Sequence, residues 1–133
     1  MVGIIVVSHG SMAEGMLDAA RMIVGDMEGI VAVSLKEEDA VENLMDRISD
    51  AIPAVDTGDG VLILVDVFGA SPFNASSRLA MVRDKIEVIS GVNLPMLLEL
   101  AIQRSDQDLE SLVHIALDVG SSSIRTLSQT LNK

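Results

Sequence analysis

The chain has 133 residues, 49% of them hydrophobic, and a formal net charge of −11. This length suits one domain with a sizeable core, and the hydrophobic content excludes a disordered tail. The negative charge repels phosphate backbones, and two Phe with no Trp or Tyr leave few platforms for stacking bases. We therefore expect no binding to nucleic acid. The absence of Cys excludes disulfides and cysteine-based metal sites.

The first residues indicate neither secretion nor membrane insertion. Residues 1–7 contain no basic region ahead of their apolar run, so they do not resemble a signal peptide. No apolar run approaches the ~20 residues that a membrane-spanning helix needs. We therefore expect a cytoplasmic protein.

Short apolar runs rich in β-branched residues alternate with segments in which apolar residues recur at helical spacing. In chain order, we first expect a strand at 2–7, a helix over 12–24, a strand at 30–35, and a helix that Asp39 caps and Pro53 ends. We then expect a strand at 61–65, a helix over 71–82 and a strand at 86–89. Two helices follow, over 94–103 and 109–117, and Gly120 is expected to break the second. Residues 124–131 fit either a helix or a short edge strand.

This alternation predicts an α/β fold of the doubly wound class, with a mostly parallel sheet and helices on both of its faces. Nothing in the sequence suggests a second domain, so we expect a single domain over residues 1–133. In such sheets, ligands bind beyond the carboxyl ends of the strands, near the point where the strand order reverses.

Two side chains that can do chemistry follow expected strands. His9 lies just after the first strand, and Asp66 directly follows the third. If these strands are neighbours, the two side chains converge. The carboxylate would then accept a hydrogen bond from one ring nitrogen, which fixes the tautomer and leaves the other nitrogen free to attack. Gly10 allows close approach to the backbone beside His9.

The loop of Phe68, Gly69 and Ala70 leads into a helix that we expect to begin with Ser71 as its N-cap and Pro72 behind it. A helix N-terminus binds anions through its free N–H groups, and the Ser71 hydroxyl could add a donor to a phosphoryl oxygen. The chain has no P-loop motif and no G-x-G-x-x-G motif, which argues against ATP and dinucleotides.

Three blocks of sequence resemble the IIA domain of the mannose family of phosphotransferase systems. They are residues 6–10 (VVSHG), residues 64–75 (LVDVFGASPFNA) and residues 89–96 (ISGVNLPM). The second and third blocks are specific, whereas His-Gly after a first strand is weak evidence alone. The resemblance extends over nearly the whole chain.

The resemblance implies a phosphoryl carrier. His9 would accept a phosphoryl group at Nε2 from the histidine-phosphocarrier protein, with Asp66 holding Nδ1 and Ser71 beside the phosphoryl group. His9 would then pass the group to the IIB component, which phosphorylates sugar entering through the membrane IIC and IID components. The family is typically homodimeric, with a C-terminal edge strand that can be exchanged. Transfer between histidines needs no cofactor and no metal. Phe68 and Met96 would form an apolar rim against partner proteins.

Three alternatives remain open. A phosphodonor subunit for dihydroxyacetone kinase shares this fold and histidine, although the F-G-A-S-P-F-N block favours the sugar system. A small cobalt chelatase also begins strand-His-Gly-Ser, but it needs a second histidine at another strand end. His114, the only other histidine, falls in an expected helix and is interpreted as structural or exposed. The third alternative is a regulatory module that uses phosphorylated His9 as a signal.

Overall fold

The computed structural model describes residues 1–131 of the chain. Its elements, in chain order, are β1 (Gly3–His9), α1 (Met12–Val24), β2 (Ile30–Leu35), α2 (Val41–Val55), β3 (Val61–Val65), α3 (Ser71–Val82), β4 (Ile86–Ser90), α4 (Leu94–Gln103), α5 (Leu109–Ser122) and α6 (Leu127–Thr130). Strands and helices alternate as the sequence predicts.

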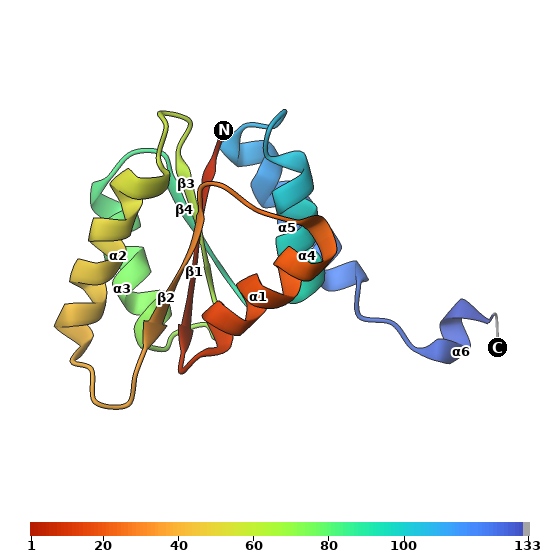
Figure 1. Ribbon diagram of the computed structural model, residues 1–133, viewed down its shortest axis with the longest axis horizontal. Coiled ribbons are helices and arrows are strands. Elements are labelled where there is room, and N and C mark those ends of the chain that lie inside the picture. Colours follow the sequence, from red (N-terminus) through yellow and green to blue (C-terminus); the bar gives the residue numbers. More distant parts are fainter. Residues whose placement is uncertain (132–133) are drawn as a thin grey trace.

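The described residues form one parallel sheet in the order β2-β1-β3-β4. Helices α2 and α3 cover one face, and helices α1, α4 and α5 cover the other (Figure 1). The predicted doubly wound α/β fold is therefore confirmed. The chain adds β2 on one side of β1 and then returns to add β3 on the other side, so the strand order reverses between β1 and β3.

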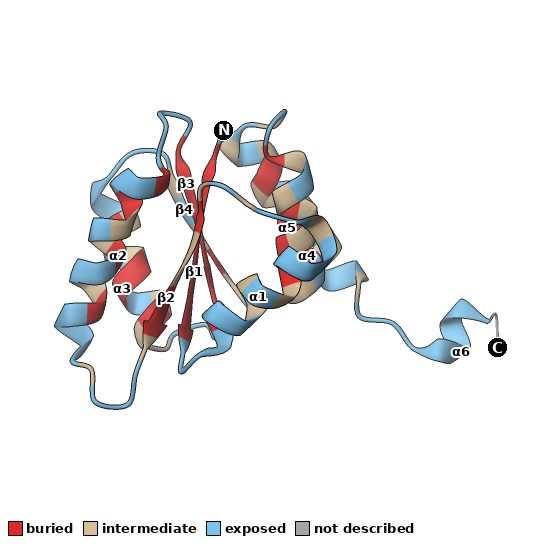
Figure 2. Ribbon diagram, viewed as in Figure 1, coloured by how far each residue is buried: buried red, intermediate tan, exposed pale blue. Residues whose placement is uncertain are grey.

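The apolar runs of the strands are nearly continuous because both faces of the sheet are covered. Ile4 and Val6 of β1 pack toward α1, α4 and α5, whereas Ile5 and Val7 pack toward α2 and α3. All four side chains are at most 1% exposed, and the strands form the buried centre of Figure 2. Burying each such side chain contributes about 1.5–3 kcal/mol, so the central strands are held rigidly between two aliphatic layers.

Two expectations about α2 are wrong. Asp39 does not cap the helix: Ala40 is the N-cap residue, and the Asp39 carboxylate accepts hydrogen bonds from the Lys36 N–H and from Arg47. Pro53 does not end the helix, which continues to Val55. Proline has a φ that suits a helix but removes the N–H that would bond to the Ser49 carbonyl, and only two residues of α2 follow it.

Gly120 does not break α5, which continues through it to Ser122. A Cβ atom at Gly120 would lie 2.7 Å from Cε of Met96, and the Asn93 amide donates to the Gly120 carbonyl at 2.9 Å. The glycine therefore permits α5 to pack closely against the start of α4. The same packing buries Met96, which is only 4% exposed, so the expected place of Met96 on an exposed rim is wrong.

The C-terminal segment projects away from the rest of the protein (Figure 1). Residues 127–130 form the short helix α6, so the structure adopts the helical alternative, and the described part of the tail contains no strand. Its apolar side chains Ile124 and Leu127 are 79% and 73% exposed. Among residues 1–131, no helix is long and apolar enough to cross a membrane.

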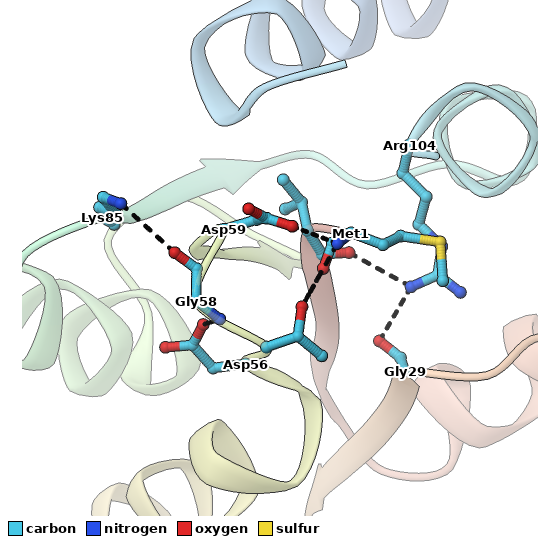
Figure 3. Close-up of polar contacts among 9 residues, drawn as sticks. Met1, Gly29, Asp56, Gly58, Asp59, Lys85 and Arg104 are labelled. Carbon is cyan, nitrogen blue, oxygen red and sulfur yellow. Dashed lines mark hydrogen bonds and ion pairs between the residues drawn. The ribbon is translucent and has the colours of Figure 1, made fainter. Parts of the chain in front are cut away.

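A buried arginine ties together the edge of the sheet where β1 and β2 begin. The Arg104 side chain extends from the end of α4, is 4% exposed, and donates to the carbonyl oxygens of Val2, Gly29 and Glu28, the first two at 3.2 Å. Figure 3 shows the hydrogen bond to Gly29. Burial lowers the pKa of this guanidinium below its ordinary value, and the nearby charge of Glu28 offsets only part of that shift. Figure 3 also shows the Lys85 ammonium donating to the Gly58 carbonyl at the same edge.

We predict that Arg104→Ala lowers the free energy of unfolding by about 2–3 kcal/mol, because the carbonyl oxygens of Val2, Gly29 and Glu28 lose their charged donor. Urea denaturation monitored by circular dichroism measures this change. Arg21→Ala is the matched control: Arg21 pairs with Asp18 on the exposed side of α1, and we expect less than about 1 kcal/mol there. Equal effects of the two substitutions would contradict the prediction.

Candidate functional site

The pairing of β1 with β3 brings the two predicted side chains together. Val7 is registered with Val65, and Asp66 directly follows β3. His9 is the last residue of β1, which ends two residues later than the sequence suggested because β2 continues the ladder through the pair of His9 and Leu35. Both side chains therefore lie at the carboxyl edge of the sheet, at the point where the strand order reverses.

His9 and Asp66 are joined by two hydrogen bonds to one oxygen atom. Oδ2 of Asp66 lies 2.7 Å from Nδ1 of the His9 ring and accepts the His9 backbone N–H, also at 2.7 Å. The Asp66 side chain is 7% exposed, whereas the His9 side chain is 51% exposed. The carboxylate is thus a buried anchor, and the ring that it holds faces solvent.

The hydrogen bonds around Asp66 keep it ionised. Burial raises the pKa of its carboxyl, but donation from the His9 backbone, the His9 ring and the Val67 backbone N–H more than compensates, so the pKa lies below its ordinary value. An ionised carboxylate only accepts hydrogen bonds, so the His9 Nδ1 atom must hold the proton. In the neutral ring, Nε2 then has the free electron pair.

The segment from Ser8 to Ala13 turns sharply out of β1 into α1. Gly10 has a φ of +57°, a conformation that glycine adopts without strain, and its N–H donates to the Leu35 carbonyl at 2.8 Å. The Ala13 N–H donates to Oγ of Ser8 at 2.7 Å. Sequence reasoning did not assign Ser8 a role. The feature of the sequence that could have indicated a role for Ser8 is its hydroxyl, which stands next to His9 at the end of an aliphatic strand.

The loop after Asp66 lies at the same edge. Gly69 has a φ of +81°, and its carbonyl accepts from the Asn74 amide at 3.1 Å. Phe68 is 74% exposed, and its ring centroid lies 4.5 Å from that of Phe73, so Phe68 does take the exposed position that the sequence predicted. Ala70, which is half-buried, is the N-cap residue of α3.

The predicted cap at Ser71 is wrong. Ser71 is the first residue of α3 and makes no capping hydrogen bond. Its half-buried side chain instead lines a cavity of about 160 Å³ between α2 and α3, with Met45 and Arg78. In the described part of the chain, no hydrogen bond joins Ser71 to His9 or Asp66. Helices α1 and α3 both begin at this edge, and the first turn of a helix has N–H groups without partners inside the helix.

The second histidine lies elsewhere. His114 is exposed on α5, as the sequence predicts, and not at a strand end, so it does not supply the second histidine that a chelatase would need. Within residues 1–131, no group of three or more His, Asp or Glu side chains is arranged to hold a metal ion.

The fold and the site define a class of protein: a doubly wound α/β domain with a histidine–carboxylate pair where the strand order reverses. The family profile EIIA-man, described as "PTS system fructose IIA component", matches residues 3–117. The chain belongs to this mannose family of IIA components of the sugar phosphotransferase system, as the three sequence blocks predicted.

Two relatives that are named for sugar systems are similar over nearly the whole chain. The mannose-specific EIIAB component of Escherichia coli (strain K12) is 35% identical over 127 residues, which are 95% of this chain and 39% of that protein. This chain thus spans well under half the length of that relative. The fructose-specific EIIA component of Bacillus subtilis (strain 168) is 27% identical over 133 residues, 100% of this chain and 91% of that protein.

Solved structures agree with this assignment. The crystal structure of phosphotransferase system component EIIA from Streptococcus agalactiae superimposes with a TM-score of 0.90 at 27% identity, covering 97% of this chain and 99% of that one. The mannose/sorbose-specific IIA subunit from Enterococcus faecalis has a TM-score of 0.86 at 26% identity, and the match covers 95% of this chain and 94% of that one.

We predict that the Asp66 carboxyl titrates below its ordinary pKa of 3.8. Because the folded-state pKa is the lower one, the stabilisation from Asp66 is complete above the unfolded-state pKa and is lost as the pH falls through the folded-state pKa. Urea denaturation from about pH 5 to about pH 2 should therefore show a flatter acid limb for Asp66→Asn than for the wild type.

Carbon-13 NMR of the carboxyl groups measures the Asp66 titration directly. The matched variant is His9→Ala, which removes the ring donor and keeps the backbone donor, so the Asp66 pKa should rise only part of the way toward 3.8. A wild-type midpoint at or above 3.8 would show that the hydrogen bonds do not outweigh burial.

Proposed function

We propose that this protein accepts a phosphoryl group on Nε2 of His9 and passes it on within a mannose-family sugar phosphotransferase system. The observation that supports this most is the contact of 2.7 Å between Nδ1 of His9 and Oδ2 of the buried Asp66. It orients an exposed ring with one nitrogen occupied and the other available. The family membership supplies the kind of group that such a ring would receive.

The transfer is a displacement at phosphorus between two imidazoles. The free electron pair of His9 Nε2 forms a bond to phosphorus while the bond from phosphorus to the donor ring nitrogen breaks, and its electrons stay with the donor ring. His9 then has a proton on Nδ1 and a phosphoryl group on Nε2, so its ring gains cationic character. The ionised Asp66 stabilises that charge. Positioning and electrostatics suffice, so we propose no cofactor and no metal.

The remaining site residues would surround the phosphoryl group. Gly10 gives the turn that places His9 at the edge, and Gly69 gives the turn before α3. We propose that Phe68 and Ala70 flank the group and that Ser71 donates its hydroxyl to a phosphoryl oxygen. The location of Ser71 at the N-terminus of α3 supports this role, since the free N–H groups of that turn attract the same anion.

We further propose that the donor is the histidine-phosphocarrier protein and that the acceptor is a IIB component, acting in the cytoplasm with membrane IIC and IID components. Two relatives are named for mannose and fructose systems, and this supports a sugar as the final acceptor. We propose the family domain over residues 1–133, of which residues 132–133 lie outside the described part.

Incubation with phosphoenolpyruvate, enzyme I and the histidine-phosphocarrier protein, followed by intact-mass measurement, tests the proposal. We predict one acid-labile phosphoryl group per chain in the wild type and none in His9→Ala. We also predict that Asp66→Asn slows phosphorylation about 10–100-fold, which corresponds to the loss of about 1.5–3 kcal/mol from a hydrogen bond to a charged group.

His114→Ala is the matched control, because His114 is the chain's other histidine and is exposed on α5. It should be phosphorylated like the wild type. No mass gain in the wild type, with a known IIA component labelled in the same mixture, would refute the carrier function. Adding a purified IIB component then tests the next step: the label should leave His9, and its retention would favour a regulatory module.

We also propose that the protein is a homodimer. Strand β4 is an open edge of the sheet, and the projecting tail exposes the apolar side chains Ile124, Leu127 and Leu131. Such apolar exposure is typical of a surface that a partner covers.

We predict a dimer by analytical ultracentrifugation and a monomer for the double variant Ile124→Glu/Leu127→Glu, because buried carboxylates would oppose association. Ser128→Glu, which adds a charge to an exposed polar residue of α6, should stay dimeric. A monomeric wild type, or dissociation by Ser128→Glu alone, would contradict the prediction.

A further inference from the structure

The start of α1 is held by an unusual partner. In most helices the N-cap side chain accepts a hydrogen bond from one of the first N–H groups. Here the N-cap residue is Ser11, and its side chain makes no such bond. Oγ of Ser8, the penultimate residue of β1, accepts the Ala13 N–H instead, at 2.7 Å.

The residues between the two ends of this hydrogen bond include His9. The bond joins the last buried residue of β1 to the first turn of α1 and closes a loop over residues 9–12. Because the Ser8 side chain is 0% exposed, this bond is shielded from water and from any partner protein. It therefore fixes the backbone from which the His9 ring projects, without being part of the exposed surface.

The location argues against a role in packing alone. Every other residue of β1 between Gly3 and Val7 is apolar or glycine, and all are buried. A hydroxyl in such a layer is unfavourable unless it is hydrogen-bonded. Ser34, the registered neighbour of Ser8 on β2, gives the comparison: it is 2% exposed, and its Oγ has no hydrogen-bond partner in the described part of the chain.

We propose that Ser8 is a positioning residue for phosphoryl transfer at His9. Its Oγ holds the segment from His9 to Ala13 so that the ring meets Asp66 with Nε2 directed outward. This inference rests on the proposed function for its effect on transfer, whereas its effect on the geometry of His9 can be measured without any phosphoryl group.

The chain offers variants that separate the hydroxyl from its volume. In the variants Ser8→Thr and Ser8→Val the new side chains have nearly the same shape, but only threonine keeps an oxygen that can accept the Ala13 N–H. Ser34→Ala removes a buried hydroxyl from the neighbouring strand, where no hydrogen bond is lost. We expect Ser8→Val to lose about ten-fold in kcat for phosphorylation, since small displacements of a reacting group are costly. Ser8→Thr and Ser34→Ala should stay within about two-fold of the wild type.

The KM for the phosphocarrier protein should change little in Ser8→Val, because a fully buried side chain does not contact a partner. A purely steric loss would instead lower the active fraction of Ser8→Val and Ser8→Thr alike, because the two new side chains have nearly the same shape. Equal kcat values for Ser8→Val and Ser8→Thr, or a loss confined to KM, would overturn the inference.

Nitrogen-15 NMR of the ring and hydrogen exchange of the amides give the second readout. In Ser8→Val we expect faster exchange of the Ala13 N–H and a smaller fraction of rings protonated at Nδ1, with both properties restored in Ser8→Thr. If the wild type accepts no phosphoryl group, the proposed function fails, and these NMR signals still decide whether Ser8 positions His9. Unchanged signals in Ser8→Val would overturn that role.

Discussion

The site depends on the contact between β1 and β3 in the middle of the sheet. His9 and Asp66 are 57 residues apart in the sequence and meet only because these two strands are paired in register. Both strands are buried on both faces, so a shift of one residue would exchange the side chains that pack into the two core layers. The aliphatic core therefore sets the distance between the ring and the carboxylate, and the site inherits the rigidity of the sheet.

The difference in exposure between the two side chains would let an acidic protein present the phosphoryl site that we propose. The net charge of −11 opposes the approach of an anion. That field is screened over about 8 Å at physiological ionic strength, whereas free helix N–H groups act in direct contact. Asp66, the negative group next to the ring, is 7% exposed, and its oxygens are already engaged by donors. An arriving phosphoryl group would thus meet the ring and the starts of α1 and α3 before it met a free carboxylate.

Much of this arrangement could be predicted from the sequence, because burial on both faces leaves a plain pattern. The strand positions, the fold class and the meeting of His9 with Asp66 followed from apolar runs and from the rule for strand ends. The errors arose where tertiary packing overrides a local signal. Gly120 was interpreted as a helix breaker, but its missing side chain makes room for Met96. Pro53 was interpreted as the end of a helix, but α2 continues two residues beyond it.

Long-range hydrogen bonds were the least predictable part. Nothing in the sequence indicates that Arg104 reaches the carbonyls of Val2 and Gly29, because the partners are more than 70 residues away and the bond is to backbone atoms. For Ser71 the sequence signal was clear but misleading. A serine before proline is a strong cap signal, yet Ala70 is the N-cap residue of α3. Local preferences of this kind amount to about 1 kcal/mol, which the geometry of a whole loop easily exceeds.

The turn around His9 shows how little machinery the proposed chemistry requires. Three elements that meet at the reversal of strand order each supply one restraint: β3 leads to Asp66, β2 offers the Leu35 carbonyl to Gly10, and β1 offers the Ser8 hydroxyl to α1. With the backbone fixed at these points, the main remaining freedom is rotation of the ring, and the bond from Nδ1 to Asp66 restricts it. An imidazole ring that only accepts and releases a phosphoryl group would gain most from such preorganisation, since in-line placement lowers the barrier to transfer without an acid or a base. In the proposed function, the buried residues beneath the turn would therefore matter as much as the exposed ring.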